Sequence, residues 1–359
     1  MQITFVLPSI GISGGGKVVL EYANRLKKRG HKVRVIYPLV TMSSGRKWYN
    51  LRNLSSKALG ILRNFKNGVH VDWFDLKARL IRVPTLYERY IPEGDIIVAT
   101  WWETAYYVKK YNKDKGEKFY LIQHYETWGG PKEKVEATYK MGLHNIVVSS
   151  WLKNKLKNIG AKVEEVILNG VNLEEFFPEK IKKDKNVIRI LMPYRKEKWK
   201  GVEDGIEAFK IVKEKYPNVK LVTFGEKPKK SEVFKEAEFH IWPTGENLRK
   251  IYNSCDIFVF PSHCEGFGLP PMEAMACKLP VVTTEVGAVP EYTIPGTTAL
   301  VVPPQNPKEL SQNIIKLIKN KELREKIAEN GYNYIKQFTW DKSVEKLEGI
   351  FKKHGRWNL

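Results

Sequence analysis

Short apolar runs of strand length alternate along the chain with longer segments whose apolar residues recur at helical spacing. In the first half, this pattern predicts helices over 17–29, 132–141 and 150–158. The strands predicted for the same half are 3–7, 32–37, 95–101, 118–124, 145–149 and 163–168. Strands separated by helices indicate a parallel sheet of the α/β class.

The alternation starts again after a charged stretch that opens with "NGV" (169–171) and runs to Lys185. The strands predicted there are 187–193, 219–224, 238–242, 257–260, 281–283 and 299–302. The helices predicted there are 201–215, 247–254, 270–277 and one from 307 nearly to the end of the chain. We therefore expect two similar domains, 1–168 and 169–339, with a helix at about 340–359 as a candidate to pack back on the first. Such sheets bind ligands beyond the carboxyl ends of their strands, so a shared site is expected in a cleft between the domains.

The composition is that of a soluble globular protein with 359 residues, of which 42% are hydrophobic. No apolar run approaches the roughly 18 residues of a membrane span. The chain begins with a strand-like segment and lacks a signal-peptide pattern. Its three cysteines, Cys255, Cys264 and Cys277, have neither a disulfide-framework nor a zinc spacing. These features favour a cytoplasmic protein.

The net charge of +21 implies an anionic partner, and the positive charge is unevenly distributed. Residues 22–71 contain twelve Lys or Arg and no Asp or Glu. Within them, 46–68 has the pattern of a basic amphipathic helix, which can lie on an anionic membrane at the inner face of the cell. The alternative is a helix docked on its own domain with a solvated basic face. Nucleic acid is not expected, because no reader motif is present.

A glycine-rich stretch, "GISGGGKVVL" (11–20), follows the first predicted strand. It nearly matches a P-loop, but Val18 stands where Ser or Thr would hold Mg²⁺. Ser13 breaks the glycine spacing of a dinucleotide site. A strand, a glycine turn and a helix start remain, and this combination suits an anion. The alternative is a tight strand-to-helix turn with no ligand.

A second glycine-rich turn, at 265–268, leads from a strand into a helix that starts near Pro270. Glu265 precedes this helix and Glu273 lies in its first turns. Carboxylates beside a phosphate-binding turn suit hydroxyl-rich groups such as sugars, although Glu273 alone also fits a helix-dipole role. Arg195 and Lys200, between another strand and helix, suit a diphosphate or a solvated loop.

Taken in order, these motifs resemble the retaining GT-B glycosyltransferases of glycosyltransferase family four, which includes sucrose-phosphate synthases and bacterial mannosyltransferases. The E-x7-E motif of that family matches Glu265 to Glu273, followed by "ACKLPVV" and "GAVPE" (287–291). Arg195 and Lys200 match its basic pair, "NGV" its interdomain linker, and "GGG" with "GHKVRV" its amino-terminal turn and second strand. The resemblance spans almost the whole chain. It implies two Rossmann-like doubly wound domains that face a central cleft, the first on the acceptor side and the second binding the donor.

The resemblance also implies roles for individual residues. Glu273 is expected to bind the ribose of a nucleotide sugar, Glu265 to face the donor sugar, and Arg195 and Lys200 to hold the diphosphate. Further donor contacts are expected from Gly15, Gly16, Gly266, Phe267, Gly268 and Leu269. Lys17 is left with two readings, contact with phosphate or simply the start of a helix.

His124, in "QHYE" at the end of a predicted strand, resembles the active-site histidine of the family, although a lone histidine is more often structural. Glu126 is a secondary candidate for contact with the acceptor. Trp242 is a candidate for contact with the base, with core packing as its alternative.

The expected reaction moves a sugar from a UDP- or GDP-sugar to an acceptor hydroxyl with retention, on a lipid-linked or cell-surface glycan precursor at the membrane face. The alternatives are a soluble sugar or polysaccharide acceptor, or a module that binds nucleotide sugars without turnover. No cofactor is expected, and no catalytic metal, because the chain has no D-x-D motif.

Overall fold

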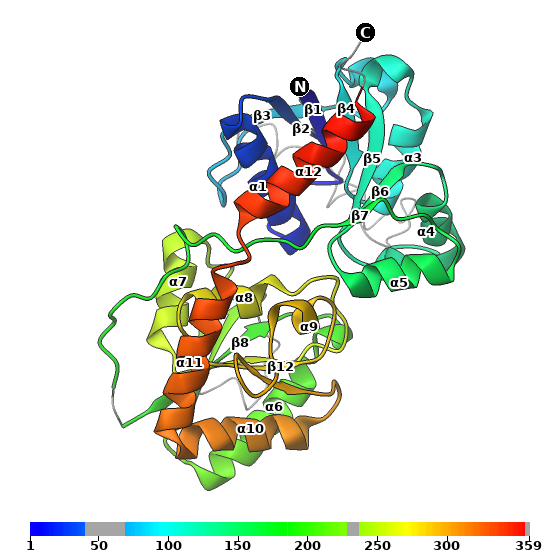
Figure 1. Cartoon of the computed structure of the whole chain (residues 1–359). Coiled ribbons are helices and arrows are strands. Elements are labelled where there is room, and N and C mark those ends of the chain that lie inside the picture. Colours follow the sequence, from blue (N-terminus) through cyan, green and yellow to red (C-terminus); the bar gives the residue numbers. More distant parts are fainter. Residues whose placement is uncertain (40–68, 185, 228–236, 356–359) are drawn as a thin grey trace, which may run out of the picture. The chain divides into compact units, whose positions relative to one another are not determined.

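The structure, a computed structural model of the chain, describes residues 1–39, 69–184, 186–227 and 237–355, and it divides into two compact units (Figure 1). Unit 1 comprises Met1–Leu168 and Trp340–Leu359, and unit 2 comprises Asn169–Thr339. The basic helix predicted at 46–68 lies outside the described residues.

Unit 1 is built on a parallel sheet, which in the described residues has seven strands in the order β3-β2-β1-β4-β5-β6-β7. The strands are β1 (Gln2–Val6), β2 (Lys32–Pro38), β3 (Arg79–Val83), β4 (Ile96–Ala99), β5 (Glu117–Ile122), β6 (His144–Val147) and β7 (Glu165–Val166). The helices are α1 (Gly14–Lys28), α3 (Trp102–Lys110), α4 (Lys132–Tyr139), α5 (Ser150–Asn158) and α12 (Trp340–His354). The chain starts in the middle of the sheet and fills it in both directions, so the winding reverses between β1 and β4.

The central strands of unit 1 are almost continuous apolar runs, and Ile3, Phe5, Val6 and Val98 are buried. This is the pattern of a parallel sheet that is covered on both faces. Because all strands run the same way, the loops after β1, β4 and β5 leave the sheet at one edge, where doubly wound sheets bind ligands.

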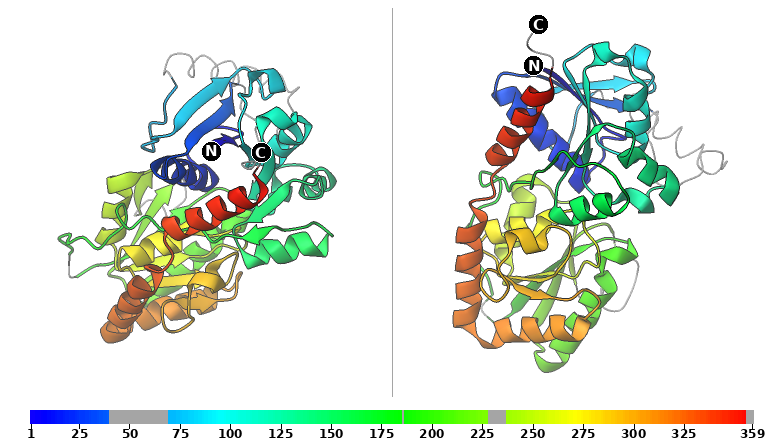
Figure 2. Two further views of the ribbon diagram at one scale, coloured as in Figure 1. Left: turned by 45° about the horizontal axis from the view of Figure 1, so that its top comes forward. Right: turned by 45° about the vertical axis from the view of Figure 1, so that its right-hand side comes forward.

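Helix α12, at the end of the chain, packs on unit 1 and lies along α1 in Figures 1 and 2. The ring of Trp340 meets that of Tyr22 edge-on at 5.4 Å, and the ring of Phe351 meets that of Phe119 at 4.8 Å. The Ser343 hydroxyl donates to the backbone carbonyl of Leu168 (2.6 Å). Large buried aromatic side chains therefore hold this helix to the first unit.

Unit 2 repeats the architecture with six parallel strands, in its described residues, in the order β10-β9-β8-β11-β12-β13. The strands are β8 (Ile188–Tyr194), β9 (Val219–Gly225), β10 (Glu238–Ile241), β11 (Ile257–Phe260), β12 (Val281–Thr284) and β13 (Leu300–Val302). The helices are α6 (Val202–Lys215), α7 (Gly245–Ser254), α8 (Leu269–Ala276), α9 (Val289–Tyr292), α10 (Pro307–Lys319) and α11 (Lys321–Ile335). The winding reverses between β8 and β11, which confirms the predicted doubly wound α/β class for this unit too.

The core of unit 2 joins the sheet to the helices that cover it. Ile190, Val259 and Val282 of the strands form one buried cluster with Val212 of α6 and Ile314 of α10. Because β8 and β11 are paired, their carboxyl ends lie side by side. The loops that follow these ends carry Arg195, Lys200 and Glu265.

Two helix predictions were wrong in extent. Helix α1 begins at Gly14 rather than at residue 17, because Ser13 caps it and its hydroxyl accepts a hydrogen bond from the Gly16 N–H (3.0 Å). The single helix predicted from 307 onward is three helices. Asn320 separates the first two, since its side chain accepts from the Leu323 N–H (2.8 Å) and caps α11.

Strand β3, helix α3 and the four-residue helix α9 were not predicted. Strand β3 has one fully buried position, Val83, and therefore lacks a continuous apolar run. Helix α3 follows β4 after two residues, and the Thr104 side chain accepts from the N–H groups of Thr100 (3.1 Å) and Trp101 (3.0 Å) at its start. The predicted strand 95–101 had included this cap.

Candidate functional site

Two loops of unit 2 leave neighbouring strands at the point where the winding reverses. After β8, the chain passes Arg195 and a short 3-10 turn, Lys198–Lys200, before α6. After β11, it passes Ser262 and Glu265 before α8. Because β8 and β11 are paired and parallel, these predicted site residues meet at the carboxyl edge of the sheet.

Lys200 and Glu265 form an ion pair at this edge. The Lys200 ammonium lies 2.9 Å and 3.0 Å from the two carboxylate oxygens of Glu265. The Ser262 hydroxyl donates to Oε1 of the same carboxylate (2.6 Å). Glu265 is buried, whereas the side chain of Lys200 is 27% exposed.

Arg195 is held against Trp242, which comes from the end of β10. The guanidinium carbon lies 4.2 Å from the centroid of the Trp242 ring, and Nη1 donates to the Tyr194 carbonyl (3.3 Å). Burial lowers the pKa of this guanidinium, and nearby carboxylates, first Glu226, oppose that effect. A Cβ at Gly225 would lie 2.2 Å from Nη1, so a glycine there leaves room for the arginine. Trp242, predicted near a base or in the core, is thus a platform for Arg195.

Glu273 lies on α8 beneath the turn and is buried. The phenol of Tyr252, from α7, donates to Oε2 of Glu273 (3.0 Å). Burial, and then the charge of Glu273, raises the pKa of Tyr252 well above its usual value, so the phenol stays a donor. This tyrosine orients the carboxylate, and no motif in the sequence pointed to it.

One left-handed glycine shapes the turn at the start of α8, and another lies in the turn that supports it. Gly268 has φ 94°, and its carbonyl accepts from the Tyr292 hydroxyl (2.7 Å). The ring of Phe267 packs on that of Tyr292 at 5.6 Å. Gly287 has φ 57°, and a Cβ there would lie 2.7 Å from the Glu265 carbonyl. The "GAVPE" turn therefore supports the Glu265 loop directly. Gly266 is buried in this turn, and Leu269 is the half-buried first residue of α8.

In unit 1, the glycine-rich stretch passes from the loop after β1 into the first turn of α1, which begins at Gly14. The side-chain amide of Gln123, beyond the end of β5, donates to the Gly15 carbonyl (3.1 Å). A Cβ at Gly11 or Gly14 would meet nothing within 4 Å, so the space beside them is open. Lys17 lies on the helix after Gly16. The structure thus brings the turn after β1 next to the segment that carries His124.

His124 is half-buried two residues beyond β5. Its ring meets the rings of Trp128 and Trp151 at 6.2 Å each, and Nδ1 lies 3.2 Å from the Tyr125 carbonyl. Aromatic neighbours on two elements therefore set the position of this imidazole.

Glu126 is buried, which argues against the contact with an acceptor that was considered for it. Its Oε2 accepts from the Tyr120 hydroxyl (2.7 Å) and from the Trp102 N–H (2.7 Å). Burial raises the pKa of Glu126 to about 8, although both hydrogen bonds oppose that rise. The carboxyl instead holds the first residue of α3 to β5.

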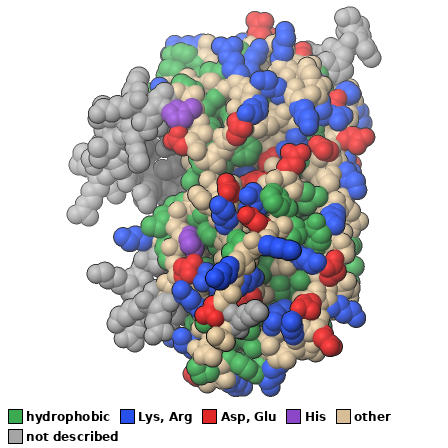
Figure 3. Space-filling view, turned by 90° about the vertical axis from the view of Figure 1, so that its left-hand side faces the viewer, with side chains coloured by type: hydrophobic (Ala, Val, Ile, Leu, Met, Phe, Trp, Pro, Cys, Tyr) green, Lys and Arg blue, Asp and Glu red, His purple; other side chains and the backbone are tan. Residues whose placement is uncertain are grey.

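On the face drawn in Figure 3, Lys and Arg side chains lie among Asp and Glu side chains. The described residues of this face therefore form no single positive patch. A search of the described residues finds no helix whose length and hydropathy would let it cross a bilayer.

Comparison with known proteins identifies the domain that carries the Glu265 loop. Residues 173–334 match the family described as Glycosyl transferases group 1. This match covers most of unit 2 and less than half of the whole chain. The resemblance seen in the sequence motifs is thereby confirmed at the level of this family.

Two curated relatives carry glycosyltransferase names. The chain is 34% identical over 214 residues to an uncharacterized glycosyltransferase, MJ1178, of Methanocaldococcus jannaschii, covering 58% of this chain and 59% of that protein. It is 31% identical over 225 residues to the capsular polysaccharide biosynthesis glycosyltransferase CapM of Staphylococcus aureus, covering 58% of each. The chain therefore matches less than two thirds of the length of these relatives.

Solved structures extend the likeness of fold to both units. Sucrose-phosphate synthase from Thermosynechococcus elongatus matches with a TM-score of 0.73 at 18% identity, covering 98% of each chain. Anabaena Alr3699/HepE in complex with UDP and glucose matches with a TM-score of 0.74 at 15% identity, covering 98% of this chain and 99% of that one. The fold is GT-B, as predicted, with two Rossmann-like units.

Proposed function

We propose that the protein is a retaining glycosyltransferase that moves a sugar from a nucleotide diphosphate to an acceptor hydroxyl. The observation that carries this proposal is the Lys200–Glu265 pair, placed where β8 and β11 diverge in a glycosyl transferases group 1 domain. Anabaena Alr3699/HepE, which shares the fold, has been crystallised with UDP-glucose. This favours a UDP-sugar as the donor, with a GDP-sugar as the other candidate.

The cations and the helix start suit the departure of a nucleoside diphosphate. As the bond to the sugar breaks, negative charge grows on the leaving phosphate. Lys200, Arg195 and the backbone N–H groups at the start of α8 are proposed to stabilise that charge, which is usually the largest contribution to catalysis. Arg195 enters the reaction already oriented by Trp242. These groups supply the positive charge, and the proposal includes no catalytic metal or cofactor.

The two carboxylates are proposed to bind hydroxyl groups. Glu265 is assigned to the donor sugar and Glu273 to the ribose, because carboxylate oxygens accept hydrogen bonds from hydroxyls. Tyr252 and Ser262 keep these carboxylates oriented. Glu273→Ala is therefore expected to weaken nucleotide binding. The glycines and Phe267 of the α8 turn are assigned to backbone contacts with sugar and phosphate, and Gly15 and Gly16 to the donor as well.

The first experiment is calorimetric titration with UDP, GDP, ADP and dTDP, followed by the matching nucleotide sugars. One nucleotide is expected to bind, and Arg195→Ala to weaken it about 10-fold or more, since hydrogen bonds to charged groups are worth about 1.5–3 kcal/mol. Lys196→Ala is the matched control, because this lysine lies in the same loop but pairs with Glu226 (3.2 Å). Equal affinity in the two variants, or no binding by any nucleotide, would contradict the donor site.

His124 is assigned a role in turnover rather than in donor affinity. His124→Ala is expected to lower the rate of sugar transfer by more than it lowers nucleotide affinity, which calorimetry and product release measure separately. Unchanged turnover would remove His124 from the mechanism. If nucleotide sugars bind to the unaltered protein but are never turned over, the protein is a module that binds nucleotide sugars and not a glycosyltransferase.

The acceptor is proposed to be a lipid-linked or cell-surface glycan precursor, with peripheral attachment to an anionic membrane through 46–68. The basic, apolar pattern of that segment supports this, as does the name of the relative from capsular polysaccharide biosynthesis. Flotation with anionic vesicles at low salt tests it. Failure to float would favour a soluble sugar or polysaccharide acceptor.

A further inference from the structure

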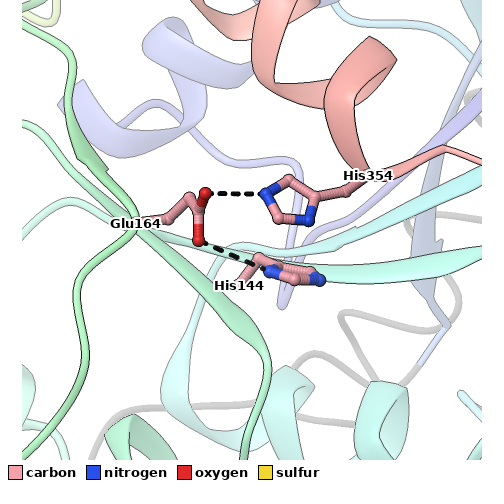
Figure 4. Close-up of side chains that lie close together, drawn as sticks. All are labelled: His144, Glu164 and His354. Carbon is pink, nitrogen blue, oxygen red and sulfur yellow. Dashed lines mark hydrogen bonds and ion pairs between the residues drawn. The ribbon is translucent and has the colours of Figure 1, made fainter.

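A second group of polar side chains, His144, Glu164 and His354, gathers in unit 1 (Figure 4). His144 is the first residue of β6 and Glu117 the first of β5, whereas His124 follows the carboxyl end of β5. Glu164 directly precedes β7, and His354 is the last residue of α12. The fold thus brings together residues that are up to 237 positions apart in the sequence, from Glu117 to His354, because α12 packs on unit 1.

Two imidazoles converge on one carboxylate in this group. His354 Nε2 lies 2.6 Å from Glu164 Oε1, and His144 Nδ1 lies 3.7 Å from Glu164 Oε2. One possible ligand atom from each of the three residues lies within 4.8 Å of the other two. The side chains are about one quarter exposed or less, so an ion from solvent can reach them.

The other nitrogen of His144 determines what its Nδ1 can do. Nε2 lies 3.1 Å from Glu117 Oε1, and a hydrogen bond to that carboxylate requires the proton to sit on Nε2. In the neutral imidazole, Nδ1 is then a lone-pair acceptor, and it faces a second acceptor, the Glu164 carboxylate. A metal ion between these two acceptors would bind a lone pair of each, whereas a water molecule in its place would donate a hydrogen bond to each.

We propose that His144 Nδ1, His354 Nε2 and a Glu164 oxygen bind a divalent transition-metal ion, with Zn²⁺ as the best fit. Two histidines and a glutamate are a known donor set for zinc, at about 2.0–2.2 Å from the ion. Such bonds place ligand atoms about 3–3.5 Å apart, so ligand atoms that lie up to 4.8 Å apart must approach each other by up to about 1–2 Å. The Glu117 contact is the arrangement that metal-binding histidines usually have, with the second nitrogen bound to a carboxylate.

The carboxylates of the group suit a cation, and the ammonium of Lys353 competes with a metal ion for Glu164. Two carboxylates, those of Glu164 and Glu117, face the ring nitrogens of His144 and supply negative charge. The Lys353 ammonium lies 3.0 Å from Glu164 Oε1, but its side chain is 69% exposed and can turn away. Metal binding therefore displaces Lys353.

The metal would join the end of α12 to the amino ends of β6 and β7 and fasten this helix to unit 1. It would take no part in sugar transfer, because His124 and the glycine turn lie at the opposite edge of the sheet. The metal site is independent of the proposed function, and the experiments below measure metal binding rather than sugar transfer.

The test uses the full chain, free of any histidine tag and stripped of metal by a chelator. Calorimetry with Zn²⁺ is expected to show one site per chain, and Zn²⁺ in large excess over its Kd to raise the Tm by about 3 °C or more. Co²⁺ in place of Zn²⁺ is expected to give the visible absorption bands of a four-coordinate site. This spectroscopic measurement on the unaltered protein stands even if a variant fails to fold.

His144→Gln and His354→Gln are each expected to weaken Zn²⁺ binding at least 10-fold. His240→Gln is the matched control, because His240 also lies beside a glutamate (Glu238, 3.0 Å) but belongs to unit 2. Lys353→Ala separates a metal site from an ion-pair cluster: it should tighten Zn²⁺ binding by removing the competitor. Three outcomes would overturn the proposal: Zn²⁺ binding that all three histidine variants retain equally, no stoichiometric binding, or no gain in affinity for Lys353→Ala. The group would then be a hydrogen-bonded cluster of histidines and glutamate without a metal.

Discussion

Glu126 shows how burial of one residue makes the stability of unit 1 depend on pH. Burial raises the pKa of its carboxyl to about 8, against 4.5 for an ordinary glutamate. Between these two values the folded chain holds a proton that the unfolded chain has lost. Stability from this group is therefore present below about pH 4.5 and is lost as the pH rises to about 8.

Replacing Glu126 with Gln is expected to remove this dependence, because the amide cannot ionise and its oxygen can still accept from Tyr120 and Trp102. Relative to the unaltered protein, the free energy of unfolding of Glu126→Gln should rise by about 2–3 kcal/mol between about pH 5.5 and 7.5. Urea unfolding at both pH values measures this difference.

The control for this prediction is Glu133→Gln, at an exposed position in the first turn of α4. Its difference from the unaltered protein should stay nearly constant over the same pH range. A difference that is equally flat for Glu126→Gln would mean that the buried carboxyl is ionised in the folded protein.

At the scale of the element, the turn before α6 depends on one glycine. Gly201 has φ 60°, and a Cβ there would lie 1.8 Å from the Pro261 carbonyl oxygen. Gly201→Ala is therefore expected to combine left-handed strain with a clash and to destabilise unit 2 by about 2–4 kcal/mol. Lys200 is the preceding residue, so nucleotide affinity should fall as well. Urea unfolding and nucleotide titration measure the two effects.

A second left-handed glycine separates strain from the clash. Gly245, the first residue of α7, has φ 54°, but a Cβ there would meet nothing within 4 Å. Gly245→Ala should carry the strain alone, about 1–2 kcal/mol, with nucleotide affinity unchanged. If the two variants lose equal stability, the contact between Gly201 and Pro261 does not constrain the loop.

The elements were predictable where burial imposes a pattern. Strands β1 and β11 are buried at nearly every position, so their apolar runs predicted them. β3 is half-exposed along most of its length and left no such run. The start of α1 was misplaced because glycines are poor helix formers, whereas the Ser13 cap and the tertiary fold override that preference.

Within the candidate site, motif spacing pointed to Lys200 and Glu265, which the structure joins in an ion pair. Tyr252 and Gln123 were missed because each reaches its partner from a different element, and a single sequence carries no signal of such contacts. The same reason hid the pairing of His144, Glu164 and His354, which depends on the return of α12 to unit 1. Local patterns predict elements, whereas their meeting points follow from topology.

At the scale of the whole molecule, the chain leaves unit 1 at residue 168 and returns at Trp340, so unit 1 is completed only by its last helix. Phe351 of α12 is fully buried against Phe119 of β5. Phe351→Ala should destabilise unit 1 by about 3–5 kcal/mol, the usual range for a buried phenylalanine. Hydrogen exchange should then accelerate in the amides of β5 and α12 and stay unchanged in those of β8 and β11. Phe258→Ala, in the core of unit 2, is the reciprocal control and should give the opposite distribution. Faster exchange in both units for either variant would show that they unfold as one cooperative body, and that α12 stabilises the entire chain rather than the unit on which it packs.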